Sequence, residues 1–560
     1  MKNSYDSLEK SIEHQLEKQI GDETKQWKVI LQCILDVTIF LASRNLAFRG
    51  SNQKLFKNGN GNFLEALELI TRHNKTLQDY THLIAKHQEE EKRMQAHYLS
   101  WKSQNEFIKE CGKLVVREVI REIKKSIYFT IITDSTPDSS HSEQITFVFR
   151  FLHFNDNQLW KVKERFLKLE ELEKKKGSDI TKLILNVLEE NELDIKNCRG
   201  QGYDNGANMA GIYNGVQALI RQNNPQAIFI PCSACSLNLC AVHAIESSAP
   251  AKSYFGNVQK LYNLFSSSPV RWKILQEETG QSLHKLSVTR WSSRIESVKP
   301  LAKKPREILK SLHRLKELDL PGESSNEVHY LIKWMNSFEF VVFTTFWFKC
   351  LMAVNNVSLL LQSTQLTLDD EVKILNGLLM DLDRIRLSWD LILIEATEVA
   401  KNLKFDKIMF TVKRTQKKII PDETAAYNHE EASKNFECNV FNVALYNLTS
   451  QMRSRFKVIE EECSKFSFLW SLQKSQTDQE LGLKAENLAK LYPEDLCKNE
   501  FSDEVRHFFS VRRNILASEK PVELLNEVYV KGLHSIFPQV CVSLRIFLTF
   551  PQWARSSCAT

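Results

Sequence analysis

Apolar positions along the chain recur with two different periods. Up to about residue 125 they recur every three or four positions, which is typical of amphipathic helices. From residue 126 apolar and polar residues alternate, which predicts strands at 127–133, 144–154 and 160–169. After about residue 300 the helical period returns. The pattern therefore predicts a small strand-containing core between two helical regions.

Helix and strand signals alternate after the third predicted strand. Strands are expected at 195–199 and 227–231, and helices at 180–188, at 215–221 and from Ser236. The order is three strands, then helix, strand, helix, strand and helix. Right-handed crossovers place the fourth strand beside the first, giving the sheet order 3-2-1-4-5. The expected fold class is an α/β sheet combined with a large helical part.

Two aspartates follow neighbouring strands of this predicted sheet. Asp134 ends the first strand, and Asp204 follows the fourth in the turn sequence YDNGAN at 203–208. Open α/β sheets bind ligands beyond the carboxyl ends of their strands, where the connections diverge. We therefore expect Asp134 and Asp204 to share one cleft, with oxygen ligands suited to Mg²⁺ or Mn²⁺.

Composition narrows the class of protein. A chain of 560 residues with 42% hydrophobic and 26% charged residues predicts two to four soluble globular domains. The net charge of +6 is compatible with nucleic acid. The 12 scattered cysteines without a secretory signal predict reduced thiols in cytosol or nucleus. The apolar run at 338–348 ends at Lys349, so we expect no membrane span and no membrane partner.

Five motifs occur in an order that resembles a known family. They are ITDSTPDSSH at 132–141, CRGQGYDNGANM at 198–209, PCSACSLNL at 231–239, SSSPVRW at 266–272 and TRWS at 289–292. Together they resemble the hAT-superfamily transposases and their zinc finger MYM-type protein 1-like relatives. The resemblance covers about residues 25–550.

The resemblance implies a fold, a site and a setting. The fold is an RNase H-like core interrupted by a helical insertion, and the site is an Asp, Asp, Glu triad that uses Mg²⁺ or Mn²⁺. Asp134 and Asp204 match the first two acids. The family's Cys-x-x-His motif is altered, because Cys232 is present but Cys235 stands at the histidine position. Arg290 and Trp291 match the family's Arg-Trp pair, and they are expected either to brace the site or contact DNA, or to be an ordinary core tryptophan with a surface arginine.

The resemblance also divides the chain and suggests its partners. It places the protein in the nucleus, with DNA and a second copy or a related transposase-like protein as partners, and with no small-molecule substrate. The expected parts are a helical N-terminal region at 1–125, an RNase H-like core at 126–300, a helical insertion at 301–520 and a truncated C-terminal dimerisation region at 521–560.

The third acid of the family's triad has no counterpart in this sequence. Family members place it shortly after the region resembling 537–551, whereas residues 552–560 read QWARSSCAT and no acid follows Glu527. Strand cleavage in this class uses two cations about 3.5–4 Å apart. Two carboxylates hold one such cation but not both, so we expect no useful transposase activity from this chain.

Three functional hypotheses follow. The leading one is a transposase-derived nuclear protein that binds DNA or a partner without cutting DNA. The second is a transposase whose C-terminal part is missing from this sequence. The third is an interaction scaffold that does not contact nucleic acid.

Simpler interpretations stand beside these. Asp134 and Asp204 could both be turn residues bonded to backbone. Cys232, Cys235, Cys240 and His243 have the spacing of a zinc set, although buried cysteines on a helix are the favoured interpretation. The lysines at 174–176 are expected to be solvated, with contact to the DNA backbone as the alternative.

Overall fold

The computed structural model describes residues 2–92, 94, 97–138, 140–287, 291–318, 320–363, 366–410, 429–471 and 477–551. The chain forms two compact units, Met1–Arg121 and Glu122–Thr560. Each unit has its own hydrophobic core, and they are described separately below.

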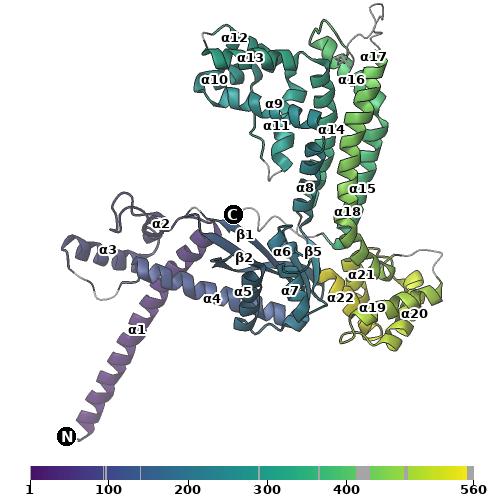
Figure 1. Ribbon diagram of the computed structural model, residues 1–560. Coiled ribbons are helices and arrows are strands. Elements are labelled where there is room, and N and C mark those ends of the chain that lie inside the picture. Colours follow the sequence, from purple (N-terminus) through teal and green to yellow (C-terminus); the bar gives the residue numbers. More distant parts are fainter. Residues whose placement is uncertain are drawn as a thin grey trace, which may run out of the picture. The chain divides into compact units, whose positions relative to one another are not determined.

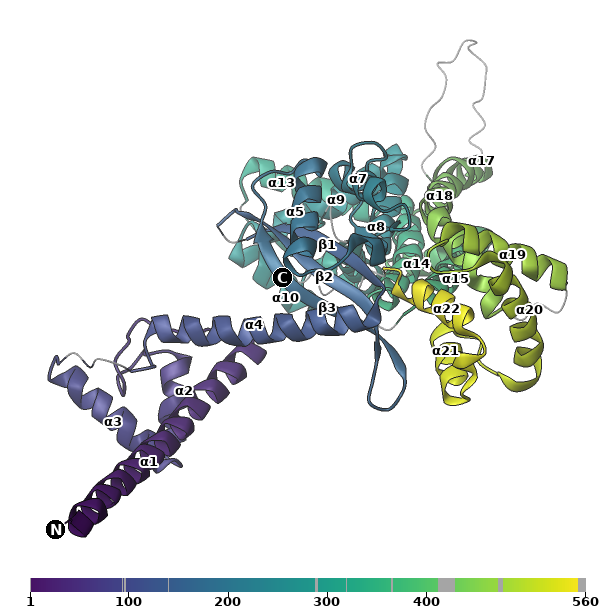
Figure 2. The same ribbon diagram turned by 90° about the horizontal axis from the view of Figure 1, so that it is seen from below.

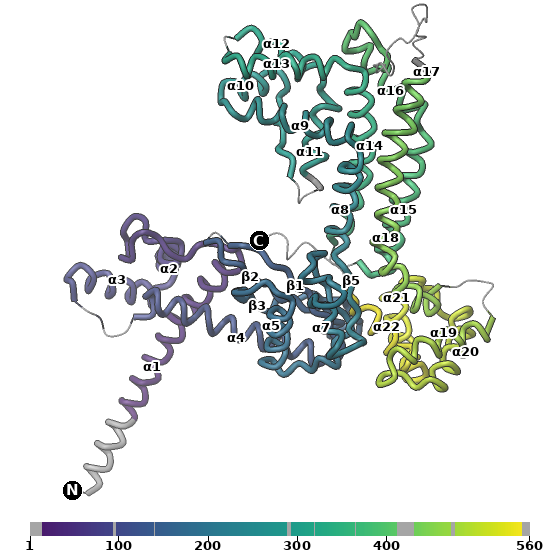
Figure 3. The backbone as a smooth tube through the Cα atoms, viewed as in Figure 1, coloured from purple at the N-terminus to yellow at the C-terminus, as the bar shows by residue number. Residues whose placement is uncertain are grey.

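The first unit is helical, as the apolar period predicts. It contains α1 (Lys2–Ser43), α2 (Asn62–Thr71), α3 (Lys75–Glu89) and most of α4 (Trp101–Ser126), traced in Figure 3. Ile34, Phe63 and Leu77 are fully buried where α1, α2 and α3 meet. The side chain of Asn74 accepts a hydrogen bond from Leu77 N (3.1 Å) and so begins α3.

The second unit contains a five-stranded mixed sheet. The strands are β1 (Phe129–Pro137), β2 (Glu143–Phe154), β3 (Trp160–Glu171), β4 (Cys198–Tyr203) and β5 (Ile228–Pro231). Their order is β3-β2-β1-β4-β5. The neighbours β1, β4 and β5 pair in parallel, and β2 pairs antiparallel with both β1 and β3. Figure 1 labels β1, β2 and β5 of this sheet. The predicted sheet order and fold class, an RNase H-like sheet with a large helical insertion, are confirmed.

Different helices cover the two faces of the sheet. On one face α7 (Val216–Asn223) is joined to β4, because the side-chain nitrogen of Gln201 donates to Gln217 O (3.1 Å), and α5 (Gly177–Glu190) packs against α7. On the other face α22 (Pro538–Thr549) contacts β2 and β4. Residues next to each other along a strand point to opposite faces, so Gly200, Gly202 and their neighbours on β1 share the α22 face.

The fourth strand begins later than the sequence predicts. Residues Ile195–Asn197 form a 3₁₀ turn, and only Cys198 starts the strand. Asp194 causes the difference, because its side chain accepts from Lys196 N (2.9 Å) and holds the turn. The alternation of apolar and polar residues does not reveal this capping bond.

The rest of the second unit is helical. Its longer helices are α8 (Ser233–Glu246), α9 (Ala249–Ser266), α10 (Pro269–Thr279), α11 (Trp291–Lys303), α12 (Pro305–Lys316), α13 (Gly322–Met335), α14 (Phe338–Leu360), α15 (Leu368–Leu387), α16 (Trp389–Asn402), α17 (His429–Phe436), α18 (Asn442–Phe466), α19 (Asp478–Leu491), α20 (Lys498–Ile515) and α21 (Pro521–Val530). The helix α8 follows β5 directly and packs along α18, and α19–α22 gather together in both views (Figures 1 and 2).

Two stretches that keep a helical period of apolar residues are each divided into two helices in the structure. The stretch 328–348 divides between α13 and α14, where Ser337 accepts from Phe340 N (3.2 Å) and starts α14. The stretch 372–393 divides at Ser388. Ser337 caps a new helix, whereas the Ser388 hydroxyl donates to Ile385 O (2.8 Å) at the end of the preceding helix. Neither break interrupts the apolar period.

One helix extends beyond the run that the sequence suggests. The helix α14 continues past Lys349 to Leu360, so it is long and apolar enough to cross a membrane by length and composition, as is the segment His14–Ser43 of α1. In α14 most of this surface is packed inside the helical region, where Phe340, Phe346 and Trp347 are almost completely buried. This burial is typical of a core helix.

Candidate functional site at the carboxyl edge of the sheet

Asp134 and Asp204 lie at the same level of two adjacent parallel strands. Ile132 of β1 is paired with Gly202 of β4, and each aspartate lies two residues further along its strand direction. Continued for two residues, this register places the two carboxylates side by side on one face. Adjacent strands are about 4.8 Å apart, so the pair can approach one common ion.

Asp134 lies inside a strand and not in the hairpin turn that follows it. Asp134 is half-buried within β1 and is paired with Thr146 of β2. The hairpin turn is held instead by Asp138, whose side chain accepts from Ser140 N (2.8 Å) and Ser142 N (3.0 Å). These bonds hold the pKa of Asp138 below its usual value, led by the bond from the Ser140 hydroxyl.

Asp204 is both a turn residue and a candidate site residue. One carboxylate oxygen, Oδ1, accepts from Gly206 N (3.1 Å), which is the turn contact that the sequence suggests. A Cβ on Gly206 would lie 3.1 Å from that oxygen and 2.7 Å from the Asn208 side chain, so glycine lets the turn fold closely over the carboxylate. Asn205 donates to Ser236 Oγ (3.0 Å) and ties this turn to α8. The turn sequence at 203–208 predicts the position of Asp204, but it does not predict the hydrogen bond from Asn205 to Ser236.

Cys232 and Cys235 lie at the same edge. Cys232 N donates to Tyr203 O (3.0 Å), so Cys232 continues the row of strand ends next to Asp204. Cys232 is the residue before α8, and its sulfur accepts from Cys235 N (3.2 Å). Cys232 shares a small buried cluster with Ile132 of β1 and Val148 of β2, and Cys235 packs against this cluster. The altered Cys-x-x-His motif is therefore part of the neighbourhood of the aspartates.

The four residues with zinc-like spacing are divided between different surroundings. Cys240 faces the large helical core, whereas Cys232 packs against the sheet and His243 is exposed. Burial raises the pKa of the Cys240 thiol to about 12. This arrangement does not bring the four side chains together.

The predicted Arg-Trp pair cannot be placed in full. Arg290 lies outside the described residues, and Trp291 begins α11 with a side chain that is also outside them. Their predicted role in bracing the site or contacting DNA stays a prediction.

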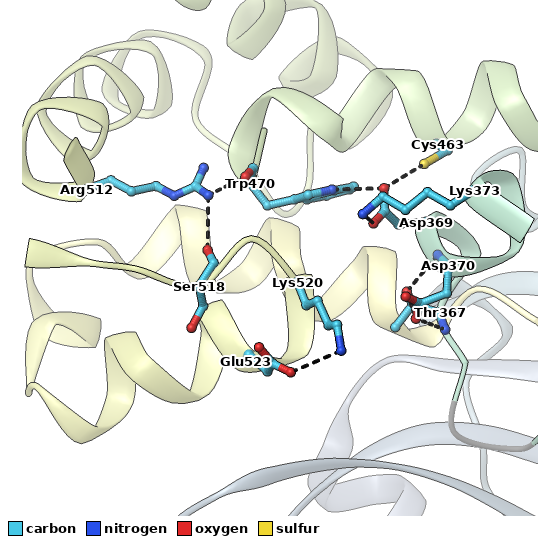
Figure 4. Close-up of polar contacts among 10 residues, drawn as sticks. All are labelled: Thr367, Asp369, Asp370, Lys373, Cys463, Trp470, Arg512, Ser518, Lys520 and Glu523. Atoms are coloured by element: carbon cyan, nitrogen blue, oxygen red, sulfur yellow. Dashed lines mark hydrogen bonds and ion pairs between the residues drawn. The ribbon is translucent and has the colours of Figure 1, made fainter. Parts of the chain in front are cut away.

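A third carboxylate does not join the pair within the described part of the chain, where no three His, Cys, Asp or Glu side chains are arranged to hold a metal. The helical region has a buried acid in Asp369, but its oxygens accept from Trp470 Nε1 (3.1 Å) and Lys373 Nζ (2.7 Å), with the Cys463 thiol at 3.9 Å (Figure 4). These bonds commit Asp369 to holding α15 and α18 together.

The oxygens of Asp134 and Asp204 fit one hard divalent cation such as Mg²⁺. They do not fit two, because two cations about 3.5–4 Å apart need additional anionic ligands. The described residues therefore support a single-ion site, and no strand-cleavage step follows from them.

The end of the described chain reaches the face that carries the aspartates. A Cβ on Gly200 would lie 2.7 Å from Pro551 Cδ, so Pro551, just after α22, passes directly over β4. Gly200 precedes Asp204 by four residues on the same strand path. Pro551 therefore lies on the sheet face that carries Asp134 and Asp204.

A basic segment borders the site, which the sequence only weakly suggests. Lys174–Lys176 are exposed and immediately precede α5. The backbone oxygen of Lys175 accepts from Asn208 Nδ2 (3.3 Å), which joins this segment to the turn that follows Asp204. Lys175 Nζ also pairs with Glu143 (2.8 Å), so Lys174 and Lys176 are the cations of the segment without a described ion pair.

The sheet order defines an RNase H-like fold. Comparison with known proteins agrees: residues 2–215 match the family model described as ZMYM1/FAM200, RNase-like domain. The chain is also similar to the human protein "52 kDa repressor of the inhibitor of the protein kinase" (24% identical over 249 residues) and to its mouse counterpart (22% over 249 residues). Each alignment covers 43% of this chain and 31% of the relative, so the matched part of the chain spans less than a third of these proteins.

Proposed function

We propose that this chain is a transposase-derived nuclear protein that binds DNA along the carboxyl edge of its sheet without cutting it. The observation that carries the proposal is the pair Asp134 and Asp204 on adjacent parallel strands, without a third metal-holding side chain among the described residues. The proposal combines an inherited nucleic-acid surface with an incomplete catalytic site.

Three further observations support DNA as the partner. The chain carries a net charge of +6, and the exposed segment Lys174–Lys176 is joined to the turn that follows Asp204. A basic segment beside the site is suited to phosphates of a strand that crosses the edge. The similar human and mouse proteins are named as repressors, a role compatible with binding in the nucleus.

Each part of the edge has a defined task in this proposal. Lys174 and Lys176 contact backbone phosphates, and the turn at 204–208 fixes their position relative to the strand ends. Asp134 and Asp204 would hold one Mg²⁺ or Mn²⁺, which would offset the negative charge of a nearby phosphate when bound. The tie from Asn205 to Ser236 keeps the edge and the first turn of α8 in register.

Salt-dependent binding to duplex DNA tests the proposal. Each phosphate contact contributes a slope of about −0.9 to the plot of log affinity against log salt. The double variant Lys174→Gln/Lys176→Gln should therefore reduce the slope by roughly 2. The matched control is Lys484→Gln/Lys490→Gln on α19, which removes the same charge from an exposed helix and should change the slope little. A flat salt response of the unmodified chain contradicts the proposal and favours the interaction scaffold.

A nicking assay separates the proposal from an active transposase. The chain is incubated with supercoiled DNA and Mg²⁺ or Mn²⁺, with Asp134→Ala as the control. The proposal expects no nicking above that of Asp134→Ala. Metal-dependent nicking that disappears in Asp134→Ala would instead favour a transposase whose third ligand comes from beyond residue 560 or from a second copy.

A further inference from the structure

We propose that Cys232 and Cys235 are a redox-active pair that forms a reversible disulfide at the edge of the sheet. The pair has the spacing Cys-x-x-Cys and spans the first turn of α8. Formation of this disulfide does not require DNA binding, so the failure of one proposal does not decide the other.

The geometry of the first turn brings the two side chains together. Cys232 is the N-cap residue of α8, and Cys235 is the third residue of the helix. Side chains at these two positions face each other, as the reciprocal bonds of a capping box show. The hydrogen bond from Cys235 N to Cys232 Sγ (3.2 Å) shows that the first sulfur already turns over the helix end toward Cys235. A disulfide needs Cα atoms only about 5.5–6 Å apart, which one helical turn provides.

Access to the two sulfurs sets the order of the reaction. Cys235 is partly exposed, whereas Cys232 is buried behind it. The thiolate of Cys235 attacks one sulfur of a small disulfide such as oxidised glutathione, forming a mixed disulfide and releasing one reduced glutathione. The sulfur of Cys232 then attacks the sulfur of Cys235, loses its proton to solvent and releases the second glutathione. Two thiols are oxidised, and one disulfide molecule is reduced to two thiols.

Other described cysteines lack this combination of a neighbour and access. Cys198, Cys240, Cys463 and Cys541 are buried, and burial raises the pKa of each thiol to about 12, which disfavours the reactive thiolate. Cys438 and Cys497 are exposed but stand in different elements. The pair at 232 and 235 is therefore the expected point of oxidation.

The disulfide would act directly on the candidate site. Cys232 is hydrogen-bonded to Tyr203, the residue before Asp204, and packs against Ile132, two residues before Asp134. Linking Cys232 to Cys235 would fix the first turn of α8 against both strand ends. Oxidation would thus restrict the edge without blocking the aspartates.

Redox titration of the full chain tests the proposal. The chain is equilibrated in buffers with increasing ratios of oxidised to reduced glutathione, quenched with acid, alkylated and digested with trypsin. Tandem mass spectrometry of the peptide 222–252 should show a 232–235 link that replaces two alkylations and reverts on reduction. Cys240, in the same peptide, should stay alkylated and serves as the internal reference.

Two variants make the result specific. Cys235→Ser should abolish the link, and Cys240→Ser should keep it with the same midpoint ratio, while thermal melting checks that both variants fold. Absence of the 232–235 link even in oxidised glutathione alone would overturn the proposal. A link that joins Cys240 instead would overturn it as well.

Discussion

Two polar regions of the second unit contain similar side chains in different surroundings. In the helical region, Asp369 is almost completely buried and accepts from Trp470 and Lys373 (Figure 4). Arg512 is fully buried and donates to the backbone oxygens of Leu469, Trp470 and Ser518, of which Figure 4 shows the bonds to Trp470 and Ser518. At the carboxyl edge of the sheet, Asp134 is half-buried within β1 and Asp204 is half-buried just after β4.

The difference separates a structural role from a functional one. A buried charge that is hydrogen-bonded within the protein stabilises one arrangement, and removing it leaves its partners unsatisfied. Two carboxylates of like charge held side by side repel each other, and a bound cation would offset this repulsion. The helical region should therefore respond to mutation through stability, and the edge through binding.

The largest expected effect is on Arg512. Burial lowers the pKa of its guanidinium to about 10, and Arg512→Met would leave three carbonyl groups without their donor. The variant should lose roughly 3–5 kcal/mol of unfolding free energy, measured by urea denaturation. The exposed neighbour Arg513 is the matched control, and Arg513→Met should lose less than about 1 kcal/mol. Equal losses of unfolding free energy in the two variants would show that the buried hydrogen bonds of Arg512 do not set it apart from an exposed arginine.

Glu504 is a partly buried carboxyl group whose surroundings lie between those of Asp369 and those of the aspartate pair. Glu504 on α20 accepts from Val540 N (2.7 Å) at the start of α22, and burial raises its pKa to about 7. The folded-state pKa is above the unfolded value, so the stability that this group contributes is complete below about pH 4.5 and is lost as the pH rises through about 7. Glu504→Gln keeps an acceptor for Val540 but does not titrate.

The unmodified chain should therefore lose on the order of 1–3 kcal/mol relative to Glu504→Gln between pH 5 and pH 8. Urea denaturation at both pH values measures this difference. Parallel pH dependences of the two proteins would show that Glu504 behaves as an ordinary surface acid. The effect is smaller than that of Arg512→Met because only one carboxyl becomes ionised, whereas Arg512→Met removes the donor of three carbonyl groups.

Much of the sheet and its edge is predictable from the sequence. Alternating apolar residues and right-handed crossovers give the order 3-2-1-4-5, which makes β1 and β4 neighbours and brings Asp134 and Asp204 together. The expectation that Asp134 ends the first strand is wrong, because β1 continues to Pro137. Small shifts, such as the start of β4 at Cys198, do not disturb this placement.

Other features depend on contacts between distant residues. The segment Lys174–Lys176 meets the turn after Asp204 only through the bond from Asn208 to Lys175, more than 30 residues away. The breaks at Ser337 and Ser388 depend on how one helix ends and the next begins, whereas the apolar period runs through both. A period reports which face is buried but not where the chain changes direction.

We expect the smallest effect on stability from substitutions of Asp134 and Asp204. These substitutions therefore test ion binding separately from stability. Asp204→Asn keeps the acceptor for Gly206 N, so the turn should persist, and Asp134→Asn keeps the size of the side chain. Each should change the unfolding free energy by less than about 1 kcal/mol, and the double variant should be no less stable, because like charges are removed. Titration with Mn²⁺, followed by calorimetry, should show one bound ion in the unmodified chain and none in the double variant. Two bound ions would reveal a further ligand and restore the case for cleavage. A large loss of stability without any change in Mn²⁺ binding would place the pair with Asp369 as a structural element.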